Sequence, residues 1–199
     1  LNGIIGFTEL LLKSPLPRQQ RDHLSTIRKS SEILLTIIND ILDFSKIEAG
    51  KLDLDFCVVN LKNSLTSLES RYRPMASEKN IEFEVSLAPG LPGEIILEEQ
   101  RFEQIVTNFL SNAIKFTHQG KVTLSASLTT TPTNISDVRW AAGELMKIEV
   151  ADTGIGISEE KHQAIFEAFE QAETGTSKSY GGTGLGLSIV NNLCTLLGW

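Results

Sequence analysis

The segment from Leu24 to Ile47 repeats apolar side chains at a spacing close to a heptad. Because this spacing keeps the apolar side chains on one face of an α-helix, it predicts a single long amphipathic helix. Apolar residues between Ile4 and Leu12 predict a shorter helix before it, and Pro15 and Pro17 interrupt the pattern between the two. The chain is therefore expected to begin with a helical hairpin.

One hairpin is too small to bury an apolar face this wide. Two hairpins packed together as a four-helix bundle would cover it, which predicts a homodimer. The alternative is that the hairpin packs onto the rest of the same chain. Periodicity alone does not distinguish the two arrangements.

The pattern changes to alternation after residue 50, which places a domain boundary between a hairpin at 1–50 and a larger domain at 53–199. Strands are predicted in the larger domain wherever apolar and polar residues alternate, and helices wherever the period is 3.6. The predicted strands are 52–58, 81–87, 94–97, 121–129 and 145–151, and the predicted helices are 61–77, 99–116 and 185–197. The expected fold class is α+β: a helical hairpin followed by an α/β sandwich, in which helices cover one face of a mixed sheet.

Composition excludes several classes of function. Apolar residues make up 41% of the chain, which is enough for a packed core, and the net charge of −7 has the wrong sign for a protein that binds nucleic acid. Cys57 and Cys194 are far apart and have no metal-ligand spacing, so both are expected to be buried thiols of a reducing compartment. No apolar run reaches the roughly 20 residues of a membrane span. We expect a soluble cytoplasmic domain whose contact with a membrane, if any, lies in other segments.

Three polar residues share one face of the predicted helix 99–116. Asn108, Asn112 and Lys115 are spaced i, i+4 and i+7, at the edge of the apolar face. Amide oxygens are hard ligands that suit Mg²⁺, and a lysine supplies positive charge for a phosphate. The alternative is that the three are a solvated flank of the helix.

A carboxylate and two glycines follow the predicted strand 145–151. In the segment Asp152-Thr-Gly154-Ile-Gly156, the glycines allow a ligand to approach the backbone closely. The carboxylate can accept a hydrogen bond from an exocyclic amine such as that of adenine. The alternative is a tight turn into a helix capped by Ser158.

A second glycine cluster opens the last predicted helix. Backbone N–H groups at a helix N-terminus can cradle phosphate oxygens, and this cluster comprises Gly181, Gly182, Thr183, Gly184, Leu185 and Gly186. It is not a Rossmann fingerprint, because no strand precedes it, and it is not a P-loop, because no Gly-Lys-Ser/Thr follows. The polar stretch before it, up to Tyr180, has the composition of a lid over a ligand.

Four segments in this order closely resemble the ATP-binding domain of sensor histidine kinases, a member of the histidine kinase, gyrase and chaperone ATPase group. They are Asn108–Thr117, Asp152–Ile157, Phe166–Gln171 and Gly181–Leu187. Residues 1–7 and 39–50 are similar to the dimerisation and phosphoacceptor hairpin of the same family. The resemblance implies a hybrid kinase of a two-component phosphorelay. Such a kinase takes ATP and Mg²⁺ as cofactors, a second copy as its dimer partner and a receiver domain, in cis or in trans, as its phosphate acceptor.

The resemblance also implies roles for individual residues. Asn108 and Asn112 would hold Mg²⁺ and phosphates, Lys115 would contact phosphate, and Asp152 would bind the adenine amino group. Gly154 and Gly156 would shape the adenine pocket. The remaining ATP-binding residues would form the lid anchor, the lid hinge and the phosphate cradle, and they are Phe169, Gly182, Thr183, Gly184, Leu185 and Gly186.

The sequence departs from the family pattern in several places. The phosphoacceptor belongs to a His-Glu/Asp-x-x-x-Pro segment that would precede Leu1, and none of the three histidines, His23, His118 and His162, lies in such a segment. We expect each of them at the surface and expect no catalytic nucleophile within these residues. Lys178 is the one cation expected near the γ-phosphate, Glu98 stands where an Asp is usual, and the family's final strands would follow Trp199.

The expected function is transfer of the ATP γ-phosphate to an upstream histidine and then to a receiver aspartate. Two alternatives are a nucleotide-binding or dimerisation module without catalysis, and an ATPase of the same superfamily that hydrolyses ATP with a Glu on the nucleotide helix. Asn108 occupies the place of that Glu. Without a general base there, activation of water is disfavoured and transfer to a protein is favoured.

Overall fold

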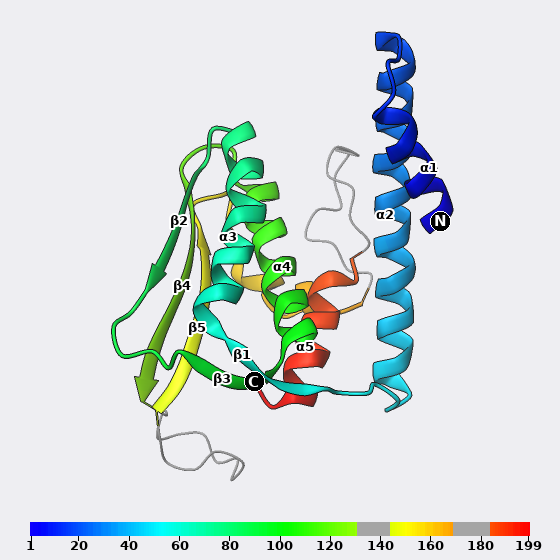
Figure 1. The fold of residues 1–199 in the computed structure, drawn as a ribbon. Helices are drawn as coiled ribbons and strands as arrows, with labels where there is room; N and C mark the ends of the chain where they lie inside the picture. The colour runs from blue at the N-terminus through cyan, green and yellow to red at the C-terminus, as the bar shows by residue number, and fades with distance from the viewer. Residues whose placement is uncertain (131–143, 169–183) are drawn as a thin grey trace. The chain divides into compact units, whose positions relative to one another are not determined.

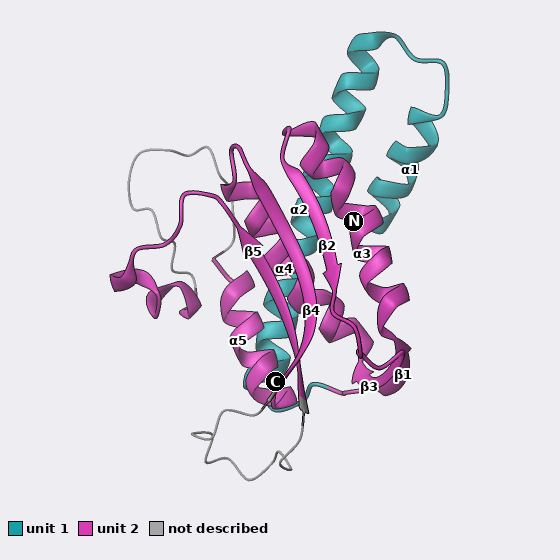
Figure 2. Cartoon of the chain, turned by 90° about the vertical axis from the view of Figure 1, so that its left-hand side faces the viewer, with its two compact units in different colours: residues 1–52 teal, residues 53–199 magenta. Residues whose placement is uncertain are grey.

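A computed structural model describes residues 1–130, 144–168 and 184–199 (Figure 1). The chain divides into two compact units, Leu1–Leu52 and Asp53–Trp199 (Figure 2).

The first unit is a helical hairpin formed by α1 (Asn2–Leu12) and α2 (Arg18–Glu48). Helix α2 begins six residues before the apolar stripe, directly after Pro17, whose extended ψ of 145° is typical of an N-cap residue. Arg21 ties the turn to the helix by donating to the carbonyl oxygens of Leu12 at 3.0 Å and Ser14 at 3.3 Å.

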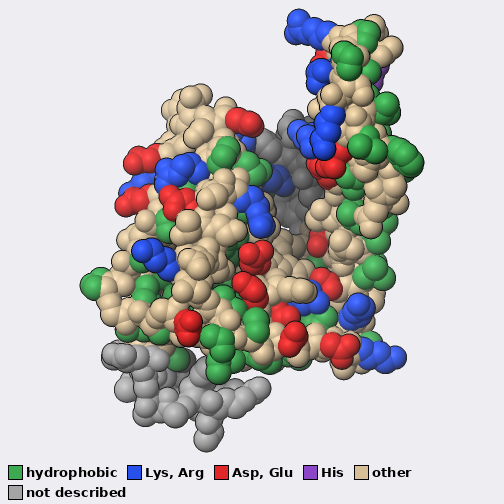
Figure 3. All heavy atoms as spheres, viewed as in Figure 1, with side chains coloured by type: hydrophobic (Ala, Val, Ile, Leu, Met, Phe, Trp, Pro, Cys, Tyr) green, Lys and Arg blue, Asp and Glu red, His purple; other side chains and the backbone are tan. Residues whose placement is uncertain are grey.

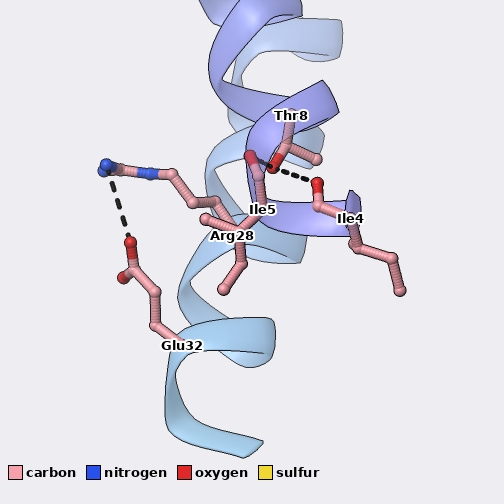
Figure 4. Close-up of polar contacts among 5 residues, drawn as sticks. All are labelled: Ile4, Ile5, Thr8, Arg28 and Glu32. Atoms are coloured by element: carbon pink, nitrogen blue, oxygen red, sulfur yellow. Dashed lines mark hydrogen bonds and ion pairs between the residues drawn. The ribbon is translucent and has the colours of Figure 1, made fainter. Parts of the chain in front are cut away.

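Small polar side chains are buried within the hairpin. Thr8 of α1 and Ser31 of α2 are both buried. Figure 4 shows that the Thr8 hydroxyl lies against its own helix, where it bonds the carbonyl oxygens of Ile4 and Ile5, each at 2.8 Å. The same view shows the Arg28–Glu32 ion pair of α2, at 3.7 Å.

The apolar face of the hairpin is not covered by its own two helices. Phe7 is 71% exposed. The other large apolar residues exposed on these helices are Ile4, Leu10, Leu11, Ile27, Ile33, Leu34, Ile38, Ile41 and Leu42. Figure 3 shows hydrophobic side chains at the surface along this unit.

The second unit contains a mixed three-stranded sheet and a separate two-stranded ribbon. In the sheet, β2 (Glu82–Leu87) runs parallel to β4 (Lys121–Thr130), and β5 (Glu144–Asp152) runs antiparallel to β4. In the ribbon, β1 (Phe56–Asn60) pairs antiparallel with β3 (Glu94–Glu98). The predicted first strand begins too early, because Phe56 pairs with Glu98, the last residue before a helix, so residues 52–55 have no strand opposite them.

Three helices cover one face of the sheet: α3 (Leu61–Glu78), α4 (Glu99–Phe116) and α5 (Gly186–Leu197), as Figures 1 and 2 show from two directions. The strands alternate accordingly, with Phe83 of β2 buried and its neighbours Glu82 and Glu84 exposed. The apolar face of α4 is buried as its spacing predicts, through Phe102, Ile105, Val106, Leu110, Ala113 and Ile114. The predicted fold class, a helical hairpin followed by an α/β sandwich, is confirmed.

The predicted burial of the two cysteines is wrong. Cys57 is exposed rather than buried, because it lies on a ribbon of only two strands in which Val59 is the one buried residue of β1. Cys194 is half-buried, and burial raises the pKa of its thiol. The alternative for the glycine segment, a turn into a helix capped by Ser158, is not found in the described range 144–168. Ser158 precedes two short 3₁₀ turns, η1 (Glu159–Lys161) and η2 (Ala164–Phe166), and makes no side-chain capping bond.

None of the helices within the described ranges has both the length and the apolar character needed to span a membrane.

Candidate functional site

Helix α4 carries three of the candidate site residues, and Glu98 fixes its N-terminus. This carboxylate is 4% exposed and accepts a hydrogen bond from the backbone N–H of Arg101 at 2.5 Å, which satisfies one of the free donors of the first turn. The buried apolar face then sets the rotation of the helix. As a result Asn108, Asn112 and Lys115 all lie half-buried at the edge of that face, as their spacing predicts.

The amide of Asn108 faces the start of α5. Its Nδ2 donates to the carbonyl oxygen of Gln104 at 3.0 Å, which fixes the orientation of the side chain. A Cβ atom at Gly186 would lie 2.6 Å from the Asn108 Oδ1. Glycine at 186 therefore lets the N-terminus of α5 approach this amide oxygen closely, and two site segments that are far apart in sequence meet here.

Lys115 lies in the last turn of α4, three residues after Asn112. Burial lowers the pKa of its ammonium group, and the like charge of Lys79 lowers it further. The Nζ atom stands 4.7 Å from the centre of the Phe116 ring. This lysine is a half-buried cation on the same face as the two asparagines.

Asp152 ends β5, and its carboxylate organises the loop that follows. Its Oδ1 accepts a hydrogen bond from the backbone N–H of Gly154 at 2.8 Å. A Cβ atom at Gly154 would lie 2.5 Å from the carbonyl oxygen of Phe116, and the N–H of Ile155 donates to that oxygen at 3.4 Å. The loop 152–156, which we call the base loop, is therefore packed against the C-terminal end of α4.

An open hollow of about 360 Å³ lies at the base loop, lined by His118, Gln119, Thr153, Gly154 and Ile155. Ile155 is 61% exposed and Ile157 47% exposed, so the loop presents apolar side chains to solvent. Gly156 has a φ of 69°, a conformation that favours glycine. A flat ring bound in the hollow would contact Ile155.

The two ends of the site lie along one helix. Asn108 and Gly186 mark one end, and the base loop at Phe116 marks the other. Eight residues of α-helix separate Asn108 from Phe116, which corresponds to about 12 Å. A nucleotide with its base at the loop and its phosphates at α5 would lie along α4.

The remaining predicted site residues divide into two groups. Gly184 has a φ of 70°, Leu185 is 1% exposed, and Gly186 is the first residue of α5, so the described part of the second glycine cluster is anchored in the core. Phe169, Lys178, Gly182 and Thr183 lie outside the described residues.

Sequence patterns did not single out Thr153 or Gly120. The Thr153 hydroxyl accepts a hydrogen bond from the Lys121 N–H at 3.0 Å, and the Thr153 N–H donates to the Lys121 carbonyl oxygen at 3.1 Å. Gly120 has a φ of 110°, and a Cβ there would overlap the Thr153 hydroxyl. The one signal was Gly120 in a turn between a predicted helix and strand.

His23, His118 and His162 are all exposed, as expected. The Nε2 of His162 lies 3.1 Å from the carbonyl oxygen of Ile157. Among the described residues, no group of three His, Cys, Asp or Glu side chains is arranged to hold a metal ion.

Comparisons with known proteins agree with this geometry. Residues 97–199 match the family described as "Histidine kinase-, DNA gyrase B-, and HSP90-like ATPase", and residues 1–50 match the "His Kinase A (phospho-acceptor) domain". The chain belongs to the histidine kinase family.

Similar histidine kinases include BarA of Escherichia coli (strain K12), which is 40% identical over 201 residues, and GacS of Pseudomonas protegens, which is 43% identical over 198 residues. Each match covers 100% of this chain and 21% of the relative. LuxQ of Vibrio cholerae, an autoinducer 2 sensor kinase/phosphatase, is 39% identical over 99% of this chain and 22% of its own length. The chain thus spans about a fifth of the length of these relatives.

Solved histidine kinase structures show the same fold. Full-length ShkA in complex with AMPPNP superposes with a TM-score of 0.74 and 34% identity, over 99% of this chain and 38% of that one. AdeS of Acinetobacter baumannii superposes with a TM-score of 0.63 at 19% identity, over 97% of this chain and 82% of its own, a likeness of fold alone.

Proposed function

We propose that this chain is the ATP-dependent core of a protein histidine kinase in a two-component phosphorelay. It binds Mg-ATP along α4 and presents the γ-phosphate to a histidine in a segment that precedes Leu1, and the phosphate then passes to an aspartate of a receiver domain. The observation that carries the proposal is the juxtaposition of Asn108 with Gly186 at one end of α4 and of the base loop, which contains Asp152, with Phe116 at the other.

In this proposal each half of the site has its own task. The Asp152 oxygen that does not hold Gly154 accepts a hydrogen bond from the adenine amino group, while Gly154 and Gly156 leave room for the ring. At the other end, N–H groups at the start of α5 bind phosphate oxygens. Lys115 lies seven residues further along α4 on the same face as Asn108, and its ammonium group would contact phosphate from there. Lys178, Phe169, Gly182 and Thr183 remain the predicted lid contacts.

The residues present suit a magnesium ion. The amide oxygens of Asn108 and Asn112 are hard ligands, and Mg²⁺ in phosphoryl-transfer sites is commonly held by few protein groups together with substrate phosphates. When bound, the ion neutralises charge on the phosphates during transfer. The hydrogen bond from the Asn108 amide to the Gln104 carbonyl oxygen supports this assignment, because it keeps the Asn108 Oδ1 at the phosphate end of the site.

Hydrolysis of ATP is the less favoured alternative. Asn108 stands where a hydrolase of this superfamily would have a Glu, and an amide cannot take a proton from water. The site therefore positions ATP for transfer to a protein nucleophile.

A comparison of ATP with GTP tests the proposed function directly. GTP presents a carbonyl oxygen where ATP has its amino group, and that oxygen would face the Asp152 carboxylate. Calorimetric titration in the presence of Mg²⁺ should show binding of ATP and at least about tenfold weaker binding of GTP, because one hydrogen bond to a charged group is replaced by a repulsion. Equal affinities for the two would contradict the assignment of Asp152 as the base-reading residue.

We also propose that residues 1–50 form half of a dimeric four-helix bundle, and that residues 53–199 form the ATP-binding domain. The exposed apolar face of α1 and α2 supports the dimer, because exposed patches of this kind mark interaction sites. A second copy would bury this face. The paired hairpins would then be the part of the dimer that contacts the receiver domain.

Charge placed on this face should dissociate the dimer. Leu34→Glu and Ile38→Glu would each put two carboxylates into the bundle, and we expect the dissociation constant to rise at least about tenfold, because unpaired buried charges are costly. Analytical ultracentrifugation over a concentration series measures this. Thr36→Glu is the matched control, because it lies about 200° around α2 from both residues. A wild-type chain that stays monomeric at all concentrations would contradict the proposed dimer.

A further inference from the structure

Each of the last four carbonyl oxygens of α4 accepts a hydrogen bond, and two of these bonds come from the residue that ends α3. The last four carbonyl groups of an α-helix lack partners within the helix unless the chain beyond supplies them. The Ala113 oxygen accepts from the N–H of Thr117 at 3.0 Å, and the Phe116 oxygen accepts from the N–H of Ile155 at 3.4 Å. The oxygens of Ile114 and Lys115 both accept from the Nζ of Lys79, at 2.7 Å and 3.2 Å.

Lys79 reaches this place because α3 ends beside α4. It is the C-cap residue of α3, and the next residue, Asn80, has a φ of 57°. Asparagine tolerates this left-handed conformation better than most residues. The N–H of Ile81 then bonds the carbonyl oxygen of Ala76 at 3.0 Å, and Ile81 is buried. The turn therefore holds the stem of Lys79 at the end of α4.

The base loop depends on the position of this helix end. Phe116 follows directly after the two carbonyls that Lys79 binds, and its own carbonyl oxygen lies against Gly154 and bonds Ile155. Gly154 in turn donates to the carboxylate of Asp152. A shift of the last turn of α4 would thus move the loop and the carboxylate together.

We propose that Lys79 is a positioning residue for the base loop: its ammonium group completes the end of α4 and so holds residues 152–156 in the geometry that receives the base. The inference rests on the proposed function in so far as it concerns a nucleotide. Lys79 lies in none of the segments that resemble the family's nucleotide motifs. A lysine suits this place because it offers several donors and its charge is favourable at a helix C-terminus.

Nucleotide affinity of three variants tests the inference. Lys79→Met keeps the stem and removes the donors, and Lys79→Arg restores donors and charge. Lys62→Met is the matched control, since Lys62 is an exposed lysine at the other end of the same helix. In calorimetric titration with Mg-ATP we expect Lys79→Met to bind about tenfold more weakly, the lower end of the loss found when groups that orient metal ligands are removed. Lys79→Arg and Lys62→Met should bind like the wild type.

Two measurements without nucleotide separate this inference from the proposed function. The amide signals of Gly154 and Ile155 in ¹⁵N spectra should move in Lys79→Met and return in Lys79→Arg. Burial and then the charge of Lys79 lower the pKa of Lys115, so loss of that charge should raise the pKa of the Lys115 side chain in a ¹³C titration, and arginine should leave it low. We expect both results even if the chain binds no ATP. Absence of ATP binding would overturn the proposed function and leave the role of Lys79 in positioning the loop intact.

Unchanged loop amides and unchanged ATP affinity in Lys79→Met would overturn the inference. An equal loss of affinity in Lys79→Met and Lys79→Arg, in proportion to a lowered melting temperature, would overturn it too, because the residue would then serve general stability. If Lys79→Met does not fold, Lys79→Gln takes its place in the same comparison, since its side chain is shorter and its amide carries no charge to strengthen bonds to the two carbonyls.

Discussion

Asp152→Asn should lower the affinity of this chain for Mg-ATP at least about 30-fold. The substitution replaces a charge-assisted hydrogen bond by an amide whose donor faces the donor of the adenine amino group. Loss of a hydrogen bond to a charged group costs on the order of 2 kcal/mol or more, which converts to this factor. Calorimetric titration of the two proteins under the same conditions measures the difference.

The geometry of the base loop makes this substitution informative. Asparagine keeps the Oδ1 atom that accepts from the Gly154 N–H, so the loop retains its internal hydrogen bond. A loss of affinity would therefore report on the ligand contact rather than on the loop. Glu149→Gln is the matched control, because it makes the same change of charge three residues earlier on β5 and should leave ATP binding unchanged. Unchanged affinity in Asp152→Asn would refute the adenine assignment.

A polypeptide of these 199 residues should bind Mg-ATP without labelling itself with phosphate. Phosphoryl transfer needs a nucleophile in line with the γ-phosphorus, and binding residues cannot replace it. None of His23, His118 and His162 lies in a His-Glu/Asp-x-x-x-Pro segment. We therefore expect no acid-labile, base-stable phosphate when the chain is incubated with radiolabelled ATP.

A His-Glu-x-x-x-Pro segment placed ahead of Leu1 should change this result from no labelling to labelling. The same segment with its histidine replaced by glutamine is the control and should stay unlabelled. Asn108→Asp in the extended chain should remove the labelling again, because a carboxylate cannot donate to the Gln104 carbonyl oxygen as the Asn108 amide does and would repel the phosphates. Phosphate on any of the three internal histidines of the chain would contradict the prediction and would require another acceptor.

Local patterns in the sequence were sufficient to predict the elements and much of the site. Helix α4 was predicted over 99–116 and is found at Glu99–Phe116. Its period also placed Asn108, Asn112 and Lys115 on one half-buried edge. These features are predictable because a helix bonds residues four apart, so the spacing of apolar side chains determines which side faces the core.

Contacts between distant segments could not be predicted in this way. The approach of Gly186 to Asn108, the bond from Lys79 to carbonyls 35 and 36 residues away, and the exposure of Cys57 have no periodic signal. The same holds for the pairing of β1 with β3 as a separate ribbon.

By itself the sequence determined the approximate ranges of most helices and strands, which faces are apolar, and which residue types are available for a nucleotide. The tertiary structure alone decided that the base loop is packed on the end of α4 and that α5 begins beside Asn108. It also decided that Lys79 bonds the last carbonyl groups of α4. The physical reason is range: periodicity records hydrogen bonding and burial within a few residues. The distance between two elements depends on how the whole core packs. In this chain Gly154 and Gly186 allow close approach to α4, and Lys79 links α3 to it by hydrogen bonds.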